Sequence, residues 1–144
     1  MPLNSVEKPG FQQLVTRLAP NLKLHGRTFF TELLKTKYIH RRQMLCSELA
    51  KATDASTTVD AWTSRRKSYL GETVHWFDKD TLKRRNACLA IKRITGSHTY
   101  DVLARVIEDI HMDFDITSKL RAATTDNGSN FCKCFRERGM HFVT

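Results

Sequence analysis

Two short runs that each end in an aspartate most constrain what this chain can fold into. Residues 56–59 lead into Asp60, and residues 122–125 lead into Asp126. Both runs are short and rich in threonine and apolar residues, which is typical of buried strands. A helical pattern lies between them, and a helical connection allows two strands to pair in parallel. The sequence therefore predicts that Asp60 and Asp126 end neighbouring strands.

Paired carboxylates at adjacent strand ends are the ligands that phosphodiester chemistry requires. Mg²⁺ prefers hard oxygen ligands, and a two-metal site holds both the attacking and the leaving oxygen. An aspartate before a turn is more often a cap, but an unpaired charge at the end of an apolar strand is costly without a partner. We therefore expect Asp60 and Asp126 to be catalytic residues and metal ligands.

The periodicity of apolar residues predicts a helical segment at residues 1–53, followed by a mixed domain at residues 54–144. One amphipathic helix spans residues 11–18 before Pro20, and a second begins at a Thr28 cap and ends near Ala52, with Leu34 and Tyr38 on its apolar face. Three strands follow, around residues 57–62, 70–76 and 87–91. We expect Ala87, Leu89 and Ile91 to share one face of the third strand.

A strong apolar stripe then predicts a helix over residues 102–112, a fourth strand over residues 120–125 and a last helix over residues 130–138. The order β-β-β-α-β-α is that of the first part of a ribonuclease-H-like α/β fold. The predicted fold is incomplete, lacks a fifth strand and is preceded by the helical segment. We expect both Trp62 and Trp76 to lie in its core, with platforms for stacking on bases as the alternative.

The charge of the chain favours a polyanionic partner. Lys and Arg number 24 against 15 Asp and Glu, giving a formal net charge of +9, and such an excess is typical of proteins that bind nucleic acid. A solvated basic surface is the alternative. The residues that we assign to DNA contact form two groups, Lys35, Lys37, Arg41 and Arg42 on the second helix and Arg65, Arg66 and Lys67 after the first strand.

Cysteine spacing and hydropathy bear on the compartment of the protein. The four cysteines show no dense disulfide framework, which favours free thiols in a reducing compartment. No apolar stretch approaches the roughly 18–20 residues that a membrane-spanning helix needs. We therefore expect no membrane partner.

Four ordered motifs, between about Leu3 and Asn130, resemble the hAT superfamily of DNA transposases and their host-adopted relatives, the BED-type zinc-finger proteins. The motifs are Val6-Glu7-Lys8-Pro9-Gly10-Phe11, Asp60-Ala61-Trp62-Thr63-Ser64, Gly96-Ser97-His98-Thr99 and Thr124-Thr125-Asp126-Asn127-Gly128-Ser129-Asn130. The resemblance implies a nuclear protein with a DNA partner, Mg²⁺ or Mn²⁺ as cofactor and Asp60 and Asp126 as the first two carboxylates of the site. It also implies that the full-length family forms homo-oligomers. We expect His98, Asn127 and Asn130 to support the site.

The resemblance also implies parts that these 144 residues do not contain. The family uses a third acid, a glutamate that follows a long helical insertion, as well as a C-terminal dimerisation segment and an N-terminal BED zinc finger. We therefore expect a truncated nuclease core that binds metal weakly or not at all and is inactive alone. The alternative is a non-catalytic, host-adopted protein that binds DNA or regulates transcription. A third reading, an unrelated basic domain with no nucleic-acid partner, stays open.

Overall fold

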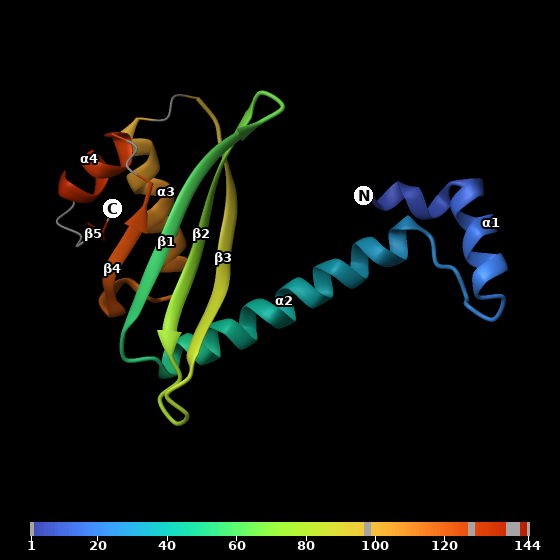
Figure 1. Ribbon diagram of the computed structural model, residues 1–144, viewed down its shortest axis with the longest axis horizontal. Coiled ribbons are helices and arrows are strands. Elements are labelled where there is room, and N and C mark those ends of the chain that lie inside the picture. The colour runs from blue at the N-terminus through green and yellow to red at the C-terminus, as the bar shows by residue number, and fades with distance from the viewer. Residues whose placement is uncertain (1, 97–98, 127–128, 138–141, 144) are drawn as a thin grey trace. The chain divides into compact units, whose positions relative to one another are not determined.

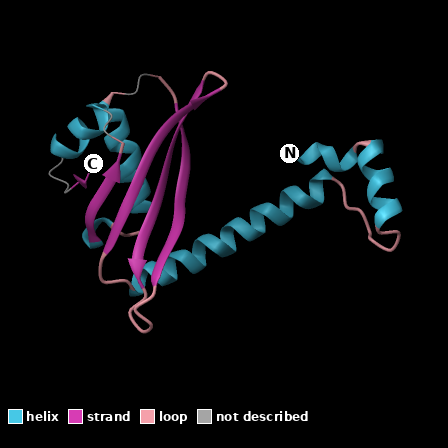
Figure 2. Cartoon of the chain, viewed as in Figure 1, coloured by secondary structure: helices cyan, strands magenta, loops and turns pink. Residues whose placement is uncertain are grey.

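The computed structural model describes residues 2–96, 99–126, 129–137 and 142–143. Its strands are β1 (Ala55–Ser64), β2 (Lys67–Phe77), β3 (Arg84–Ile94), β4 (Leu120–Thr125) and β5 (Phe142–Val143). Its α-helices are α1 (Pro9–Leu18), α2 (Arg27–Lys51), α3 (Tyr100–Asp113) and α4 (Ser129–Glu137), and two 3₁₀ turns, η1 (Leu3–Glu7) and η2 (Thr117–Lys119), complete the described elements (Figures 1 and 2). No helix among these residues is both long and apolar enough to cross a membrane.

The sheet has the strand order β3-β2-β1-β4-β5 (Figure 1). β1, β2 and β3 form an antiparallel meander, and β1 also pairs in parallel with β4. Helix α3 makes the crossover between β3 and β4 that this parallel pairing requires. The predicted ribonuclease-H-like α/β fold and its β-β-β-α-β-α order are therefore confirmed.

The prediction that a fifth strand is missing was wrong. Phe142–Val143 forms β5, which pairs in parallel with β4. The sequence gives little sign of it, because a two-residue strand is too short to show any periodicity. The sheet therefore continues beyond β4.

The predicted common face of Ala87, Leu89 and Ile91 was also wrong for Ile91. Thr73 pairs with Cys88 and Glu72 pairs with Ala90, so Leu89 is an extra residue in β3. Such a bulge shifts the alternation of side chains by one position. Leu89 is therefore buried, whereas Ile91 is 62% exposed.

The core lies between one face of the sheet and the helices α3 and α4, which Figure 1 shows on the same side of it. Alternate residues of β1 and β2 point into this core, among them Val59, Leu70 and Val74. On α3, the predicted apolar stripe supplies the buried side chains Leu103, Ile107 and Ile110. We call this face of the sheet the inner face and the opposite one the outer face.

Contacts divide the chain into two compact units, Met1–Met44 and Leu45–Thr144, and α2 belongs to both. The predicted domain boundary at residues 53 and 54 stays a prediction. In the second unit, the Lys119 ammonium donates hydrogen bonds to the carbonyl oxygens of Leu49 (2.7 Å) and Ala50 (2.9 Å). A lysine placed there satisfies carbonyls that the end of a helix leaves unpaired.

In the first unit, the predicted Thr28 cap of the second helix was wrong. The helix begins at Arg27, whose amide donates a hydrogen bond to the Glu7 carboxylate (2.9 Å). Leu34 and Tyr38, predicted to share the apolar face of this helix, are 54% and 65% exposed. Periodicity detects an apolar stripe but does not show what covers it.

A buried polar pair links the sheet to α3. Glu72 on β2 and His111 on α3 are 0% and 2% exposed, and Glu72 Oε1 lies 2.6 Å from His111 Nε2. The second carboxylate oxygen of Glu72 has no hydrogen-bond partner among the residues that the structure describes. Because a buried carboxylate is costly without its partner, His111 is needed to keep Glu72 inside.

We therefore expect His111→Leu to destabilise the fold by about 3–5 kcal/mol, since it leaves the Glu72 carboxylate buried and alone. The double variant Glu72→Leu/His111→Leu removes the charge as well and should recover most of that loss. Urea unfolding followed by circular dichroism measures both. A double variant less stable than His111→Leu would contradict this account of the pair.

Candidate metal and nucleic-acid site

Asp60 and Asp126 occupy equivalent positions on two neighbouring parallel strands. The last residue pair between β1 and β4 is Val59 with Thr125, and each aspartate is the next residue along its chain. Asp60 continues β1, whereas Asp126 follows the end of β4. Both are exposed. Register alone therefore brings together two carboxylates that are far apart in the sequence.

The alternation of side chains places Asp60 on the outer face. Val59 and Thr125 are buried towards the helices, while the paired residues Thr58 and Thr124 are exposed on the other side. Asp60 follows this alternation, and the Asp126 carboxylate accepts a hydrogen bond from the Thr125 hydroxyl (3.4 Å). A metal ion or substrate can therefore reach Asp60 from the outer face, and Asp126 is exposed just beyond the end of β4.

Two exposed carboxylates fit the oxygen preference of Mg²⁺ or Mn²⁺. Within the described ranges, no group of three His, Cys, Asp or Glu side chains lies close enough together to hold an ion. An ion held by Asp60 and Asp126 would therefore complete its coordination with water or with oxygens of a ligand. Mg²⁺ usually keeps several waters, so two carboxylates are compatible with the way proteins bind this ion.

A strained basic turn projects beyond these carboxylates. Ser64 pairs with Lys67, so Arg65 and Arg66 form a two-residue hairpin turn, with φ angles of 48° and 62°. Two positive φ angles suit the twist of a hairpin, but such turns strongly prefer Asn-Gly, because a side chain in the left-handed region costs energy. The stability of the turn therefore does not explain why arginine occupies both positions.

The hairpin lies past the end of β4, because Figure 1 shows that the β1–β2 ribbon extends farther than β4. Arg65, Arg66 and Lys67 are all exposed. Arg65 is five residues beyond Asp60, which corresponds to about 16 Å along an extended strand. The predicted basic group and the carboxylates therefore share one end of the sheet.

The other predicted basic group belongs to the unit Met1–Met44. Lys35, Lys37 and Arg41 are exposed on α2, and Arg42 is half-buried. Lys35 forms an ion pair with Glu32 at 2.8 Å. The structure does not relate this group to Asp60 and Asp126, which belong to the other unit.

The predicted supporting residues lie at the edge of what the structure describes. His98 and Asn127 fall outside the described residues, and Asn130 is described only as part of α4. Their roles beside Asp126 stay predictions. Among the residues that the structure describes, the cysteines form no disulfide.

Trp62 is a residue that the sequence analysis placed wrongly. It is 39% exposed and stacks on Tyr69, with ring centroids 5.8 Å apart, whereas Trp76 is buried as predicted. A Cβ atom on Gly71 would come within 2.8 Å of the Trp62 ring, so glycine is what allows the indole to lie across β2. The signal was present, because Trp62 is two residues after Asp60 and shares its face.

A family model for the ZBED1 RNase-like domain matches residues 58–141, more than half of the chain and including both aspartates. The chain belongs to this family. The match confirms the predicted descent from hAT-type transposases, but it shows nothing of a BED zinc finger.

Curated relatives agree with that assignment. The chain is 30% identical over 130 residues to the "Putative AC transposase" of Zea mays, covering 89% of this chain and 16% of that protein. It is 28% identical over 138 residues to the "Putative transcriptional regulator tpeD" of Talaromyces stipitatus, covering 90% of this chain and 16% of that protein. The chain therefore spans about a sixth of the length of the relatives it matches.

Solved structures with a similar arrangement include the HTLV-2 integrase catalytic core domain in complex with magnesium. It is 14% identical, with a TM-score of 0.30, over 65% of this chain and 61% of that one. Endonuclease V from Bacillus subtilis is 11% identical, with a TM-score of 0.31, over 64% and 44% of the two chains.

Removal of either carboxylate should weaken metal binding at this site. We expect Mn²⁺ to bind weakly to the parent chain and at least about tenfold more weakly, or about 1.4 kcal/mol, to Asp60→Asn and to Asp126→Asn. Electron paramagnetic resonance of free Mn²⁺ during a titration measures this. Asp80→Asn, in the exposed turn between β2 and β3, is the matched control. Unchanged binding in either site variant would show that the two aspartates do not share an ion.

Proposed function

We propose that this chain is a DNA-associated, transposase-derived nuclease core whose end formed by β1 and β4 faces the DNA. The observation that carries the proposal is the register that places Asp60 beside Asp126, with the strained Arg65–Arg66 turn beyond them. Carboxylates that bind metal and arginines that contact phosphate are the two components of a phosphodiester-processing site. The net charge of +9 supports a DNA partner and, with it, a nuclear location.

Asp60 and Asp126 would hold the divalent ion. A bound Mg²⁺ or Mn²⁺ would activate water and stabilise charge on the phosphate oxygens. The protein's own part is positional, because β1 and β4 fix the two carboxylates on adjacent strands. The basic hairpin would hold the DNA backbone near them. We propose oligomer formation and recognition of a particular DNA sequence only for the longer relatives, and not for this chain.

We further propose that the chain alone binds DNA without cutting it. Two carboxylates fix neither the number nor the alignment of the ions, and the loss of positioning should raise the barrier by several kcal/mol. A second candidate function is a regulator that binds DNA without any chemistry. The relative named as a transcriptional regulator favours it.

A nicking assay on supercoiled plasmid tests the missing activity. We expect no nicking by the purified chain in Mn²⁺, because two carboxylates are too few to align the ions with the attack. Robust nicking that disappears in both Asp60→Asn and Asp126→Asn would contradict catalytic inactivity and establish a competent site. Nicking that persists in both variants indicates a contaminating nuclease, and repurified protein then decides.

The strained hairpin provides a test in which stability and binding move in opposite directions. We expect Arg65→Asn/Arg66→Gly to stabilise the fold by about 1–2 kcal/mol, because Asn-Gly suits two positive φ angles, and to weaken DNA binding several-fold. Thermal unfolding and fluorescence anisotropy with a labelled duplex measure the two effects. Both effects are needed for the proposed role.

The control is Arg65→Lys/Arg66→Lys, which keeps the charge and the unfavourable conformation. It should bind DNA almost as the parent does and gain no stability. A stabilised Asn-Gly variant that binds DNA as tightly as the parent would show that the hairpin does not contact the DNA.

A further inference from the structure

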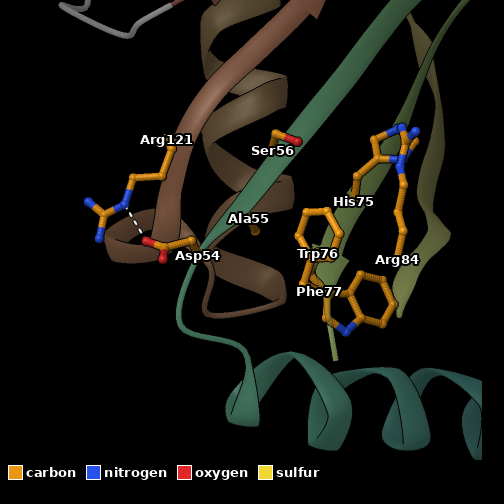
Figure 3. Close-up of a pocket in the computed structure, with 8 residues that line it drawn as sticks. All are labelled: Asp54, Ala55, Ser56, His75, Trp76, Phe77, Arg84 and Arg121. Carbon is orange, nitrogen blue, oxygen red and sulfur yellow. Dashed lines mark hydrogen bonds and ion pairs between the residues drawn. The ribbon is translucent and has the colours of Figure 1, made fainter. Parts of the chain in front are cut away.

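A pocket opens on the outer face of the sheet, at the opposite end of β1 from the hairpin. Its volume is about 350 Å³, and its lining includes Ser56, His75, Phe77 and Arg84 (Figure 3). Register places these four residues on one face, because Ser56 pairs with His75 and Phe77 pairs with Arg84. They come from three strands, so the pocket exists only in the folded sheet.

His75 contributes a polar atom that lacks a partner. Its Nε2 lies 3.2 Å from Thr58 Oγ1 and 3.4 Å from Thr73 Oγ1, whereas its Nδ1 is buried without a hydrogen bond to any described residue. Burial, and after it the positive charge of Arg84, lower the pKa of His75 below its usual value of 6.5. Both effects favour the neutral form of the ring. When a threonine hydroxyl donates to Nε2, Nδ1 carries the proton and is a donor with no acceptor.

The positive charge beside this donor is not neutralised. Arg84 is exposed and makes no ion pair with any residue that the structure describes. The other arginine of the pocket, Arg121, is paired with Asp54. Figure 3 shows that pair on the β4 side of Ser56, with His75 and Arg84 on the β3 side. The β3 side of the pocket is therefore electropositive and offers donors to an anion.

The pocket is aligned with the carboxylates along β1. Ser56 and Asp60 share the outer face and are four residues apart, which is about 13 Å along the strand. That length corresponds to about four base-pair steps of 3.4 Å each in duplex DNA. A DNA strand at Asp60 that runs along β1 can therefore reach Arg84.

We propose that this pocket binds a backbone phosphate of the DNA, with Arg84 and His75 as its donors. The proposal rests on the proposed function and extends it, since it gives the DNA a second contact point and a direction along β1. Phe77, 64% exposed at the rim of the pocket, is placed to contact the adjoining nucleotide. Inorganic phosphate offers the same oxygen atoms and serves as the comparison ligand.

The first test measures the salt dependence of DNA binding by the full chain. Arg84→Gln should flatten the slope of log K against log salt by about 0.9, because one phosphate contact is lost. The matched control is Arg85→Gln, which removes the same charge from the next residue. Arg85 opposes the buried Trp76 on the other face and is paired with Asp78 at 3.5 Å, so its loss should leave the slope unchanged.

The second test measures the pKa of His75 in the parent chain. A phosphate beside the imidazole stabilises its protonated form, so a DNA duplex should raise the pKa of His75. Nuclear magnetic resonance measures this pKa. The His75→Gln spectrum assigns the signal. Inorganic phosphate should produce a smaller rise at high concentration.

The outcomes separate this inference from the proposed function. Equal slopes for Arg84→Gln and Arg85→Gln, with a His75 pKa that DNA does not raise, would overturn the pocket inference alone. A response of His75 to inorganic phosphate but not to DNA would also overturn it. A parent chain that does not bind DNA even at low salt would overturn the proposed function as well.

Discussion

The parallel pairing of β1 with β4 is the constraint on which the rest of the structure depends. Parallel neighbours need a crossover, which α3 supplies, and α3 in turn covers the inner face of the sheet and forms much of the core. The same pairing ends at Val59 and Thr125, so that Asp60 and Asp126 emerge side by side. Stability and the candidate site therefore come from one interaction.

The two faces of the sheet have different roles. The inner face is apolar apart from a few buried polar groups, chiefly Glu72, which His111 accompanies. The outer face bears Asp60, Trp62 and the phosphate pocket, and the strained arginine turn lies at its end. Because strand side chains alternate, each residue that stabilises the core on β1 is followed by one that is available for function.

The sequence predicted the features that repeat over several residues and missed those set by one residue. Periodicity predicted α1, α2, α3 and the first four strands, and the helical crossover predicted that Asp60 and Asp126 end neighbouring parallel strands. The bulge at Leu89 was not predictable, because nothing in the local pattern marks the extra residue. The pocket was missed because Ser56, His75 and Arg84 meet only through the register of three strands. Exposure of Trp62 could have been predicted from its spacing to Asp60.

We propose that Asp60 and Asp126 bind a divalent metal jointly, and metal-directed cleavage of the protein backbone tests this most directly. With added hydrogen peroxide and ascorbate, Fe²⁺ bound in place of Mg²⁺ reduces the peroxide to hydroxyl radicals that cut the chain close to the ion, and mass spectrometry locates the cuts. We expect paired cuts around residues 58–62 and 124–128, both suppressed by excess Mg²⁺. Cuts around only one aspartate, or at sites away from both, would contradict the claim.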